Sequence, residues 1–163
     1  MSNPGPGRSL AAVLFVFVFA FAGTATARTD LVRVEGLTAP VKVTRDSDGI
    51  AHIRALRSRD LYFMQGYVHA EDRLFQMDVT RRQPSGTLAE LLGPRVLGGD
   101  VEARTIGLRR AAERSLPALT RRTRQALEAY ADGVNRWVEE NDLPPEYDAL
   151  NIGFEPWTPV DSV

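Results

Sequence analysis

The chain has 163 residues, of which 44% are hydrophobic and 25% are charged, a composition typical of a globular protein rather than a disordered tail. Its 20 basic and 21 acidic side chains are interleaved along the sequence, which argues against a nucleic-acid-binding surface. The absence of cysteine excludes disulfide bonds, thiol chemistry and cysteine-based metal sites.

Residues 1–27 have the pattern of a secretory signal peptide. Residues 10–22 form an unbroken apolar run that is shorter than the roughly 20 residues needed by a transmembrane helix. Ala25 and Ala27 supply the small residues that signal peptidase requires, so we predict cleavage between Ala27 and Arg28. The alternative is an uncleaved N-terminal anchor. In both cases the rest of the chain is expected in the periplasm or outside the cell. With cleavage, the chain is expected to contact the membrane only transiently, through its signal peptide.

The mature chain begins with a pattern of residues that is typical of β-strands. Apolar residues cluster from Leu31, and hydrophobic and polar residues then alternate up to a turn rich in Asp and Gly at residues 46–49. Because these residue types tolerate the left-handed backbone of a tight turn, the pattern predicts a β-hairpin that joins residues 41–45 to residues 50–54. Strands this short need further structure to pack against.

Helical spacing follows the hairpin. Apolar residues recur at intervals of three and four from residue 58 to residue 82, which predicts a helix over this range. Residues 83–86, with their proline and glycine, are expected to break it. Residues 87–92 then predict one or two further turns, which Gly93 and Pro94 stop.

The second half of the chain contains the clearest helix. A polar, glycine-containing link is expected to lead to residues 106–116, and residues 120–141 carry an apolar stripe with charges on the opposite face. Residues 142–163 are rich in proline and aromatic residues, a pattern typical of a chain laid over a larger body. Because the sequence ends without a helix stop or polar tail, we interpret it as truncated.

Few side chains are candidates for acid–base chemistry. His52 and His69 are the only histidines, and a metal site could be imagined from them with Asp46 and Glu71. Their spacing does not place two ligands on one helical face, so we expect a strand residue and a helix-surface residue instead. Ser85 lies in turn sequence without the surroundings of a hydrolase nucleophile, and we expect it to serve the turn.

Two groups of charges stand out on the predicted helix of residues 58–82. Asp72 and Arg73 lie among apolar residues, and we interpret them as a partly buried ion pair or hydrogen-bond network that fixes helix packing. Arg81 and Arg82 are interpreted as helix-end charges that interact with the last carbonyl groups. Neither group is assigned a catalytic role.

Four segments resemble, in the same order, the start of the first subunit of the penicillin acylases, a family of N-terminal-nucleophile hydrolases. They are residues 41–54, 60–93, 126–140 and 154–159. The strongest part lies between residues 66 and 77. The residues there that match the motif, and that we assign to the scaffold only, are Tyr67, Asp72, Arg73 and Gln76.

The resemblance implies an α+β fold in which residues 28–163 are the N-terminal part of the first subunit. This part would supply mainly helices and a short hairpin to a four-layer α/β/β/α sandwich. In the family an exported precursor cuts itself, and the new N-terminal serine of a second subunit is the nucleophile with its own amino group as base. The resemblance therefore implies no catalytic residue, metal ligand or cofactor in this chain, and a calcium site, where the complete enzyme has one, belongs mostly to the second subunit.

The reaction implied is hydrolysis of the amide between an acyl group and an amine. Candidate substrates are β-lactams, acyl-homoserine lactones and acylated lipopeptides, and the expected partners are the second subunit and the acylated amine. By itself the chain is expected to be inactive and poorly stable. The alternative is an exported binding module without catalysis, or the remnant of a disrupted gene.

Overall fold

The computed structural model describes residues 28–163, and it confirms the predicted hairpin. Strand β2 (Val41–Arg45) pairs antiparallel with β3 (Ala51–Arg54), with Val43 opposite Ile53. Strand β1 (Arg28–Val32) pairs with the other edge of β2, so the sheet has three strands in the order β1-β2-β3. The predicted signal peptide and Ala27 lie outside the described residues.

The hydrogen bonds of the turn and the alternation of buried and exposed residues along β2 explain why the hairpin forms. The Asp46 carboxylate accepts the backbone N–H groups of Asp48 and Ile50 at 3.0 and 2.9 Å, and Gly49 has a φ of +80°. Val41 and Val43 are buried while Lys42 between them is exposed. The two valines lie in one apolar cluster with Met64 and Val68 of the following helix, and this contact gives the short strands the packing they need.

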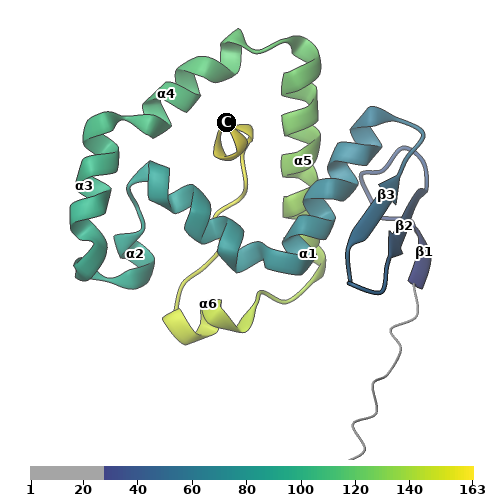
Figure 1. Ribbon diagram of the computed structural model, residues 1–163, viewed down its shortest axis with the longest axis horizontal. Coiled ribbons are helices and arrows are strands. Elements are labelled where there is room, and N and C mark those ends of the chain that lie inside the picture. Colours follow the sequence, from purple (N-terminus) through teal and green to yellow (C-terminus); the bar gives the residue numbers. More distant parts are fainter. Residues whose placement is uncertain (1–27) are drawn as a thin grey trace, which may run out of the picture.

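Helix α1 (Ser58–Ser85) is longer than predicted and is bent. The expected break at residues 83–86 is wrong by three residues: the helix continues through Pro84 and ends at Gly86, whose left-handed conformation (φ +65°) lets its N–H bond to the carbonyl groups of Arg82 and Gln83. Arg73 has non-helical angles (φ −157°, ψ 36°) and divides α1 into two arms. Figure 1 shows the resulting bend.

The predicted long helix is confirmed as α5 (Arg121–Glu140), with Thr120 as its N-cap. It crosses the first arm of α1 at two glycines, where the backbones touch. A Cβ atom added to Gly66 would lie 2.1 Å from the Tyr130 carbonyl oxygen, and one added to Gly133 would lie 1.9 Å from that of Phe63. Only glycine permits this approach.

The expected link before residue 106 is wrong, because most of it is helical. Helix α2 (Ala89–Leu92) and a 3-10 turn, η1 (Pro94–Val96), lead into α3 (Leu97–Ile106). The reason is a tertiary contact: the buried Asp100 carboxylate of α3 accepts the N–H groups of Leu88 and Ala89 at 3.0 and 2.7 Å. Gly107 then turns the chain into α4 (Leu108–Ser115), and η2 (Leu116–Ala118) leads to α5.

The last residues lie across the other helices of the same chain. Helix α6 (Pro145–Leu150) buries Tyr147, an extended stretch buries Trp157, and the 3-10 turn η3 (Pro159–Ser162) follows. Both aromatic residues pack in one cluster with Leu74 and Val134. In Figure 1 the C-terminal end lies inside a ring formed by α1, α3, α4 and α5.

The predicted α+β class is confirmed, since one small antiparallel sheet lies at one end of a mostly helical body (Figure 1). Within residues 28–163 no helix has the length and apolar character that crossing a membrane requires.

The glycine crossing predicts a sharp contrast between two glycine-to-alanine changes. Gly133→Ala forces the α1 and α5 backbones apart and is expected to lower the free energy of unfolding by about 2 kcal/mol or more. Gly99→Ala, in α3 with nothing within 4 Å of the added Cβ, should leave it unchanged or raise it by up to about 1 kcal/mol. Urea unfolding followed by circular dichroism compares the two, and equal effects would contradict the crossing.

Candidate functional site

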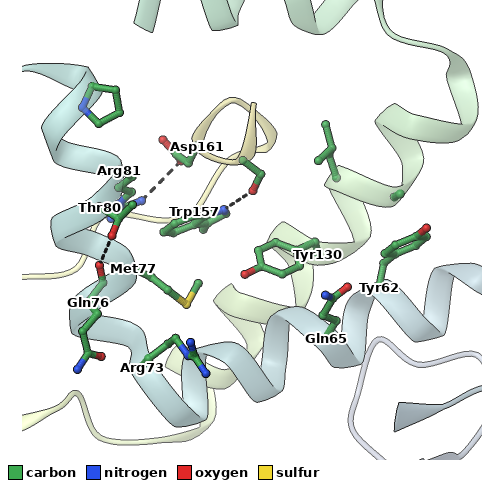
Figure 2. Close-up of a pocket in the computed structure, with 14 residues that line it drawn as sticks. Tyr62, Gln65, Arg73, Gln76, Met77, Thr80, Arg81, Tyr130, Trp157 and Asp161 are labelled. Carbon is green, nitrogen blue, oxygen red and sulfur yellow. Dashed lines mark hydrogen bonds and ion pairs between the residues drawn. The ribbon is translucent and has the colours of Figure 1, made fainter. Parts of the chain in front are cut away.

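One concavity is a hollow of about 640 Å³ between the two arms of α1, α5 and the C-terminal stretch. Its apolar wall includes Met77, Leu127, Tyr130 and Trp157, and Arg73 adds a cation. We call this hollow, with these five residues, the central groove. Figure 2 shows the side chains converging on it from the three segments.

Arg73 and Gln76, two of the four scaffold residues, line the central groove. Both are exposed. No hydrogen bond or ion pair joins the Arg73 guanidinium to another described residue, although its charge acts on His69 and Tyr130 nearby. The helix kink at Arg73 places this unpaired cation at the groove, as Figure 2 shows.

The predicted pairing of Asp72 with Arg73 is wrong. The Asp72 carboxylate instead binds Arg45 of β2 at 2.7 Å, and Glu71 binds the same guanidinium at 2.6 Å. These acidic groups fix the sheet to α1, and they raise the pKa of Arg45, with the hydrogen bond that Arg45 donates to Asp72 as the largest cause. Tyr67, the fourth scaffold residue, donates to Glu140 at 3.1 Å, and its partial burial raises the pKa of its phenol.

A buried charge cluster, formed by Asp78, Arg81 and Arg82, lies in the second arm of α1. Asp78 is fully buried, and one of its oxygens accepts from Arg81 at 2.7 Å and from Arg82 at 3.2 Å. Its other oxygen accepts from the Tyr147 hydroxyl at 3.3 Å, and burial, followed by the Asp78 charge, raises the pKa of that phenol. The interpretation of Arg81 and Arg82 as helix-end charges that interact with the last carbonyl groups is therefore wrong, because both are buried and paired with the Asp78 carboxylate.

Arg81 joins this cluster to the C-terminal stretch. Its guanidinium lies over the rings of Phe154 and Trp157, 4.7 and 5.0 Å from their centres. It also donates to the backbone carbonyls of Glu155 and Pro156 at 2.7 and 3.3 Å. One arginine therefore holds the extended residues before η3 against α1.

Asp161 connects the same region to α4. Its carboxylate forms a short ion pair with Arg109 and accepts the N–H and hydroxyl of Thr158 at 2.7 and 2.8 Å. Burial by itself would raise the pKa of Asp161, but the hydrogen bonds from Arg109 and Thr158 outweigh it and lower that pKa. Asp161 is thus held as a carboxylate beside the groove.

Both histidines are hydrogen-bonded to another side chain. His52 in β3 binds the Asp46 carboxylate at 2.8 Å, and His69, partly buried rather than on the helix surface, binds the Tyr130 hydroxyl at 2.9 Å. The Ser85 hydroxyl donates to the Arg81 carbonyl at 2.7 Å, within its own helix. Among the side chains that the structure describes, those of residues 33–163, no three His, Asp or Glu residues are grouped as metal ligands would be.

The groove has the chemistry of a binding surface. Its two aliphatic hydroxyl groups are occupied, since Thr80 donates to the Gln76 carbonyl at 2.7 Å and Ser162 accepts from the Trp157 indole at 2.9 Å. Neither hydroxyl is hydrogen-bonded to a base that could activate it as a nucleophile. What the groove offers is an apolar wall beside one unpaired cation.

Comparisons with known proteins agree on the family. The sequence profile of the penicillin amidase family matches residues 40–163. The chain is 42% identical over 131 residues to a penicillin acylase 2 proenzyme of Pseudomonas sp. (strain SE83) and 34% identical over 133 residues to penicillin G acylase of Escherichia coli. It is 37% identical over 131 residues to the acyl-homoserine lactone acylase QuiP of Pseudomonas aeruginosa. These matches cover 78–80% of this chain but only 16–17% of each relative.

Comparison with solved structures leads to the same family. The structure of a thermostable penicillin G acylase from Alcaligenes faecalis matches with a TM-score of 0.68 and 37% identity, over 75% of this chain and 67% of that one. The proteins that match in sequence and in fold are named as acylases. The chain belongs to the penicillin amidase family, which confirms the resemblance inferred from its motifs.

The buried charge cluster predicts unequal effects for two aspartates of α1. Asp78→Ala leaves two buried guanidinium groups without their shared anion and should lower the free energy of unfolding by about 3–5 kcal/mol. Asp72→Ala removes an exposed partner of Arg45 and should cost about 0–1 kcal/mol. Thermal or urea unfolding measures both, and a cost for Asp78→Ala as small as that for Asp72→Ala would refute the role of the cluster.

His69 predicts a loss of stability in mild acid. Burial lowers its pKa, and the neighbouring Arg73 charge lowers it further, so the unfolded chain binds the proton more tightly than the folded one. Its contribution is complete above about pH 6.5 and declines as the pH falls below that value. Urea midpoints of the native chain and of His69→Gln, measured from pH 8 to pH 5, should therefore diverge with acid, and parallel profiles would contradict this assignment.

Proposed function

We propose that this chain is the opening part of the first subunit of an exported acylase, which hydrolyses the amide between an acyl group and an amine. Residues 1–27 direct export and are removed between Ala27 and Arg28. The observation that carries the proposal is the 42% identity to a penicillin acylase proenzyme, which extends through the scaffold motif that borders the central groove.

The catalytic step belongs to polypeptide beyond this segment. The described groove supplies an apolar wall and a cation but no activated hydroxyl, so the nucleophile is assigned to the N-terminal serine of a second subunit, with its own α-amino group as base. Attack on the amide carbonyl forms an acyl-enzyme and releases the amine, and water then releases the acid. No calcium ligand is assigned to residues 28–163, and a calcium site of the complete enzyme would be built from the second subunit.

The substrate class follows from two kinds of relative. The same residues match proteins named as penicillin acylases and proteins named as acyl-homoserine lactone acylases, at 34–42% and 37% identity. An acylated β-lactam and an acyl-homoserine lactone share the acyl amide, and acylated lipopeptides present the same bond. We therefore propose a linear acyl amide as the reacting group and leave the amine part open.

The second candidate is a non-catalytic exported binding module or a gene remnant. The observation that favours it is that the chain spans only 17% of the length of the Pseudomonas sp. proenzyme. The two candidates differ in the DNA that follows the codon for Val163. A reading frame that continues into a spacer and a serine-led second subunit supports the acylase. A stop codon followed by no such frame supports the module or the remnant.

The acylase proposal predicts that this segment works inside a relative. Residues 40–163 replace the matched segment of the Pseudomonas sp. proenzyme, and the chimera should mature into two subunits and release the acyl group from a penicillin. The 42% identity and the shared fold make the exchange compatible with the remaining polypeptide. Gel electrophoresis of the subunits and titration of the released acid measure the two results.

The controls separate the segment from the whole enzyme. Residues 28–163 by themselves should release no acid from any acylated amine. A chimera with Gly133→Ala, which disturbs the helix crossing, should mature poorly, whereas Gly99→Ala should behave like the parent chimera. Release of acid by residues 28–163 that is abolished by Ser85→Ala would instead make the chain a complete small hydrolase.

A further inference from the structure

Residues 104–124 carry a concentration of positive charge. They contain seven arginines and a single acidic residue, Glu113, whereas the whole chain has a net charge of −1. These residues form the end of α3, the helix α4, the turn η2 and the start of α5. In Figure 1 these elements follow one another along the outer rim of the ring of helices, so the positive charge gathers on one part of the molecule.

Three of the seven arginines have partners within the chain. Arg104 and Arg124 donate to backbone carbonyl groups, and Arg109 pairs with Asp161. The other four are exposed, and no hydrogen bond or ion pair joins them to another described residue. These four are Arg110, Arg114, Arg121 and Arg122. Their guanidinium groups are therefore available to bind an external anion.

The positions of these arginines do not serve the stability of their helices. Arg110 lies in the first turn of α4, Arg121 and Arg122 open α5, and neither helix has an acidic residue in its first turn. Because the backbone dipole makes the start of a helix positive, cations at this position are unfavourable. An anion supplied from outside the chain would compensate this repulsion.

Large apolar side chains are exposed next to these charges. Leu97, Val101 and Ile106 of α3 are each more than half exposed. Leu97 and Val101 lie four residues apart and therefore on one face of the helix, while Ile106 borders a hollow of about 570 Å³ between α3 and the end of α1. We call the four unpaired arginines and these three apolar residues the basic rim. Such exposed apolar side chains are typical of an interaction surface.

The two kinds of side chain together indicate the partner. Guanidinium groups bind phosphate through paired hydrogen bonds, and both nucleic acids and lipid headgroups present phosphate. A nucleic acid would leave the aliphatic side chains of α3 in water. The boundary between lipid headgroups and acyl chains, in contrast, takes up apolar and basic side chains together. The basic rim therefore fits the anionic surface of a membrane.

We propose that the basic rim binds the anionic surface of a phospholipid membrane. Its four arginines contact the lipid phosphates, and its apolar side chains enter the boundary below the headgroups. The contact is peripheral, since no helix within the described residues can span a membrane. It adds to the transient contact expected of the signal peptide, and it goes beyond the proposed function because it involves no step of amide hydrolysis.

Vesicle sedimentation tests the proposal. Cells produce the full sequence, and the exported chain is purified so that it is tested in the form in which the cell leaves it. The chain is mixed with vesicles of phosphatidylcholine alone or with an equal part of phosphatidylglycerol. We expect binding to the anionic vesicles that weakens with added salt, and much less binding to the neutral ones. Equal binding to both kinds of vesicle, or binding to neither, overturns the proposal.

Two matched pairs of substitutions locate the contact. Arg110→Gln with Arg114→Gln should lower the ratio of bound to free chain about tenfold or more. Arg54→Gln with Arg57→Gln removes the same charge from exposed arginines near the sheet and should leave that ratio nearly unchanged. An equal loss from the two pairs would show that only net charge matters, and would contradict the assignment to the basic rim.

A further pair separates a membrane from other phosphate-bearing partners. Leu97→Gln with Val101→Gln keeps every arginine and should weaken vesicle binding several-fold, because these side chains no longer enter the lipid. Leu56→Gln, at an exposed position outside the basic rim, is the control and should bind like the parent chain. If the apolar pair also binds like the parent chain, the rim holds phosphate without entering a membrane, and the proposed partner is wrong.

Stability measurements show whether these arginines serve the fold instead. Arg121→Gln with Arg122→Gln should keep or raise the melting temperature, because it removes cations from a helix start, while vesicle binding falls. A lower melting temperature would assign the two arginines to the fold and count against the proposal.

The mature chimera with the Pseudomonas sp. proenzyme tests the rim in a whole enzyme. It should bind the anionic vesicles and lose this binding with Arg110→Gln and Arg114→Gln. Binding that is the same with and without these substitutions would show that the rest of the enzyme covers the rim, and would overturn the inference. A chimera that hydrolyses no penicillin but still binds vesicles through the rim would remove the proposed function and leave the inference intact.

Discussion

The arrangement of this segment depends on the contact of α1 and α5 at Gly66 and Gly133. There the two backbones approach so closely that a single added methyl group would overlap a carbonyl oxygen. Close approach brings the flanking side chains into register, so Val134 and Leu74 become fully buried and the Tyr130 hydroxyl reaches His69. The sheet packs on the first arm of α1 and the C-terminal stretch on the second, so both take their positions from this crossing.

The second arm adds a constraint of a different kind. A fully buried carboxylate such as that of Asp78 is tolerated only when its charge and lone pairs are matched, and two arginines and a tyrosine hydroxyl match them here. Arg81 in turn needs its remaining donors satisfied, and the carbonyls of Glu155 and Pro156 satisfy them. The C-terminal stretch is therefore held by the hydrogen-bonding needs of one buried arginine as well as by apolar packing.

The sequence predicted those elements whose cause is local. Alternation and a turn at residues 46–49 predicted the hairpin, and an apolar stripe predicted α5. The helix α3 was missed because Asp100 is bonded to residues 88 and 89, a contact that no periodicity reveals. At the candidate site the motif singled out Arg73 and Gln76, but neither the kink nor the pairing of Asp72 with Arg45 follows from spacing. The signal that was available for the buried charge cluster was Asp78 three and four residues before two arginines.

In this segment the buried polar side chains have hydrogen-bond partners, whereas several large apolar side chains are exposed to solvent. Among the described side chains, those of residues 33–163, no buried nitrogen or oxygen lacks a hydrogen-bond partner, so their polar contacts are complete. The apolar surface is not, since Val101 and Ile106 of α3 are 58% and 64% exposed and Met77 and Leu127 of the groove wall are only partly buried. Further polypeptide would therefore contribute buried area rather than missing hydrogen bonds. This asymmetry describes a segment whose polar contacts are internal, while its apolar faces remain available for packing.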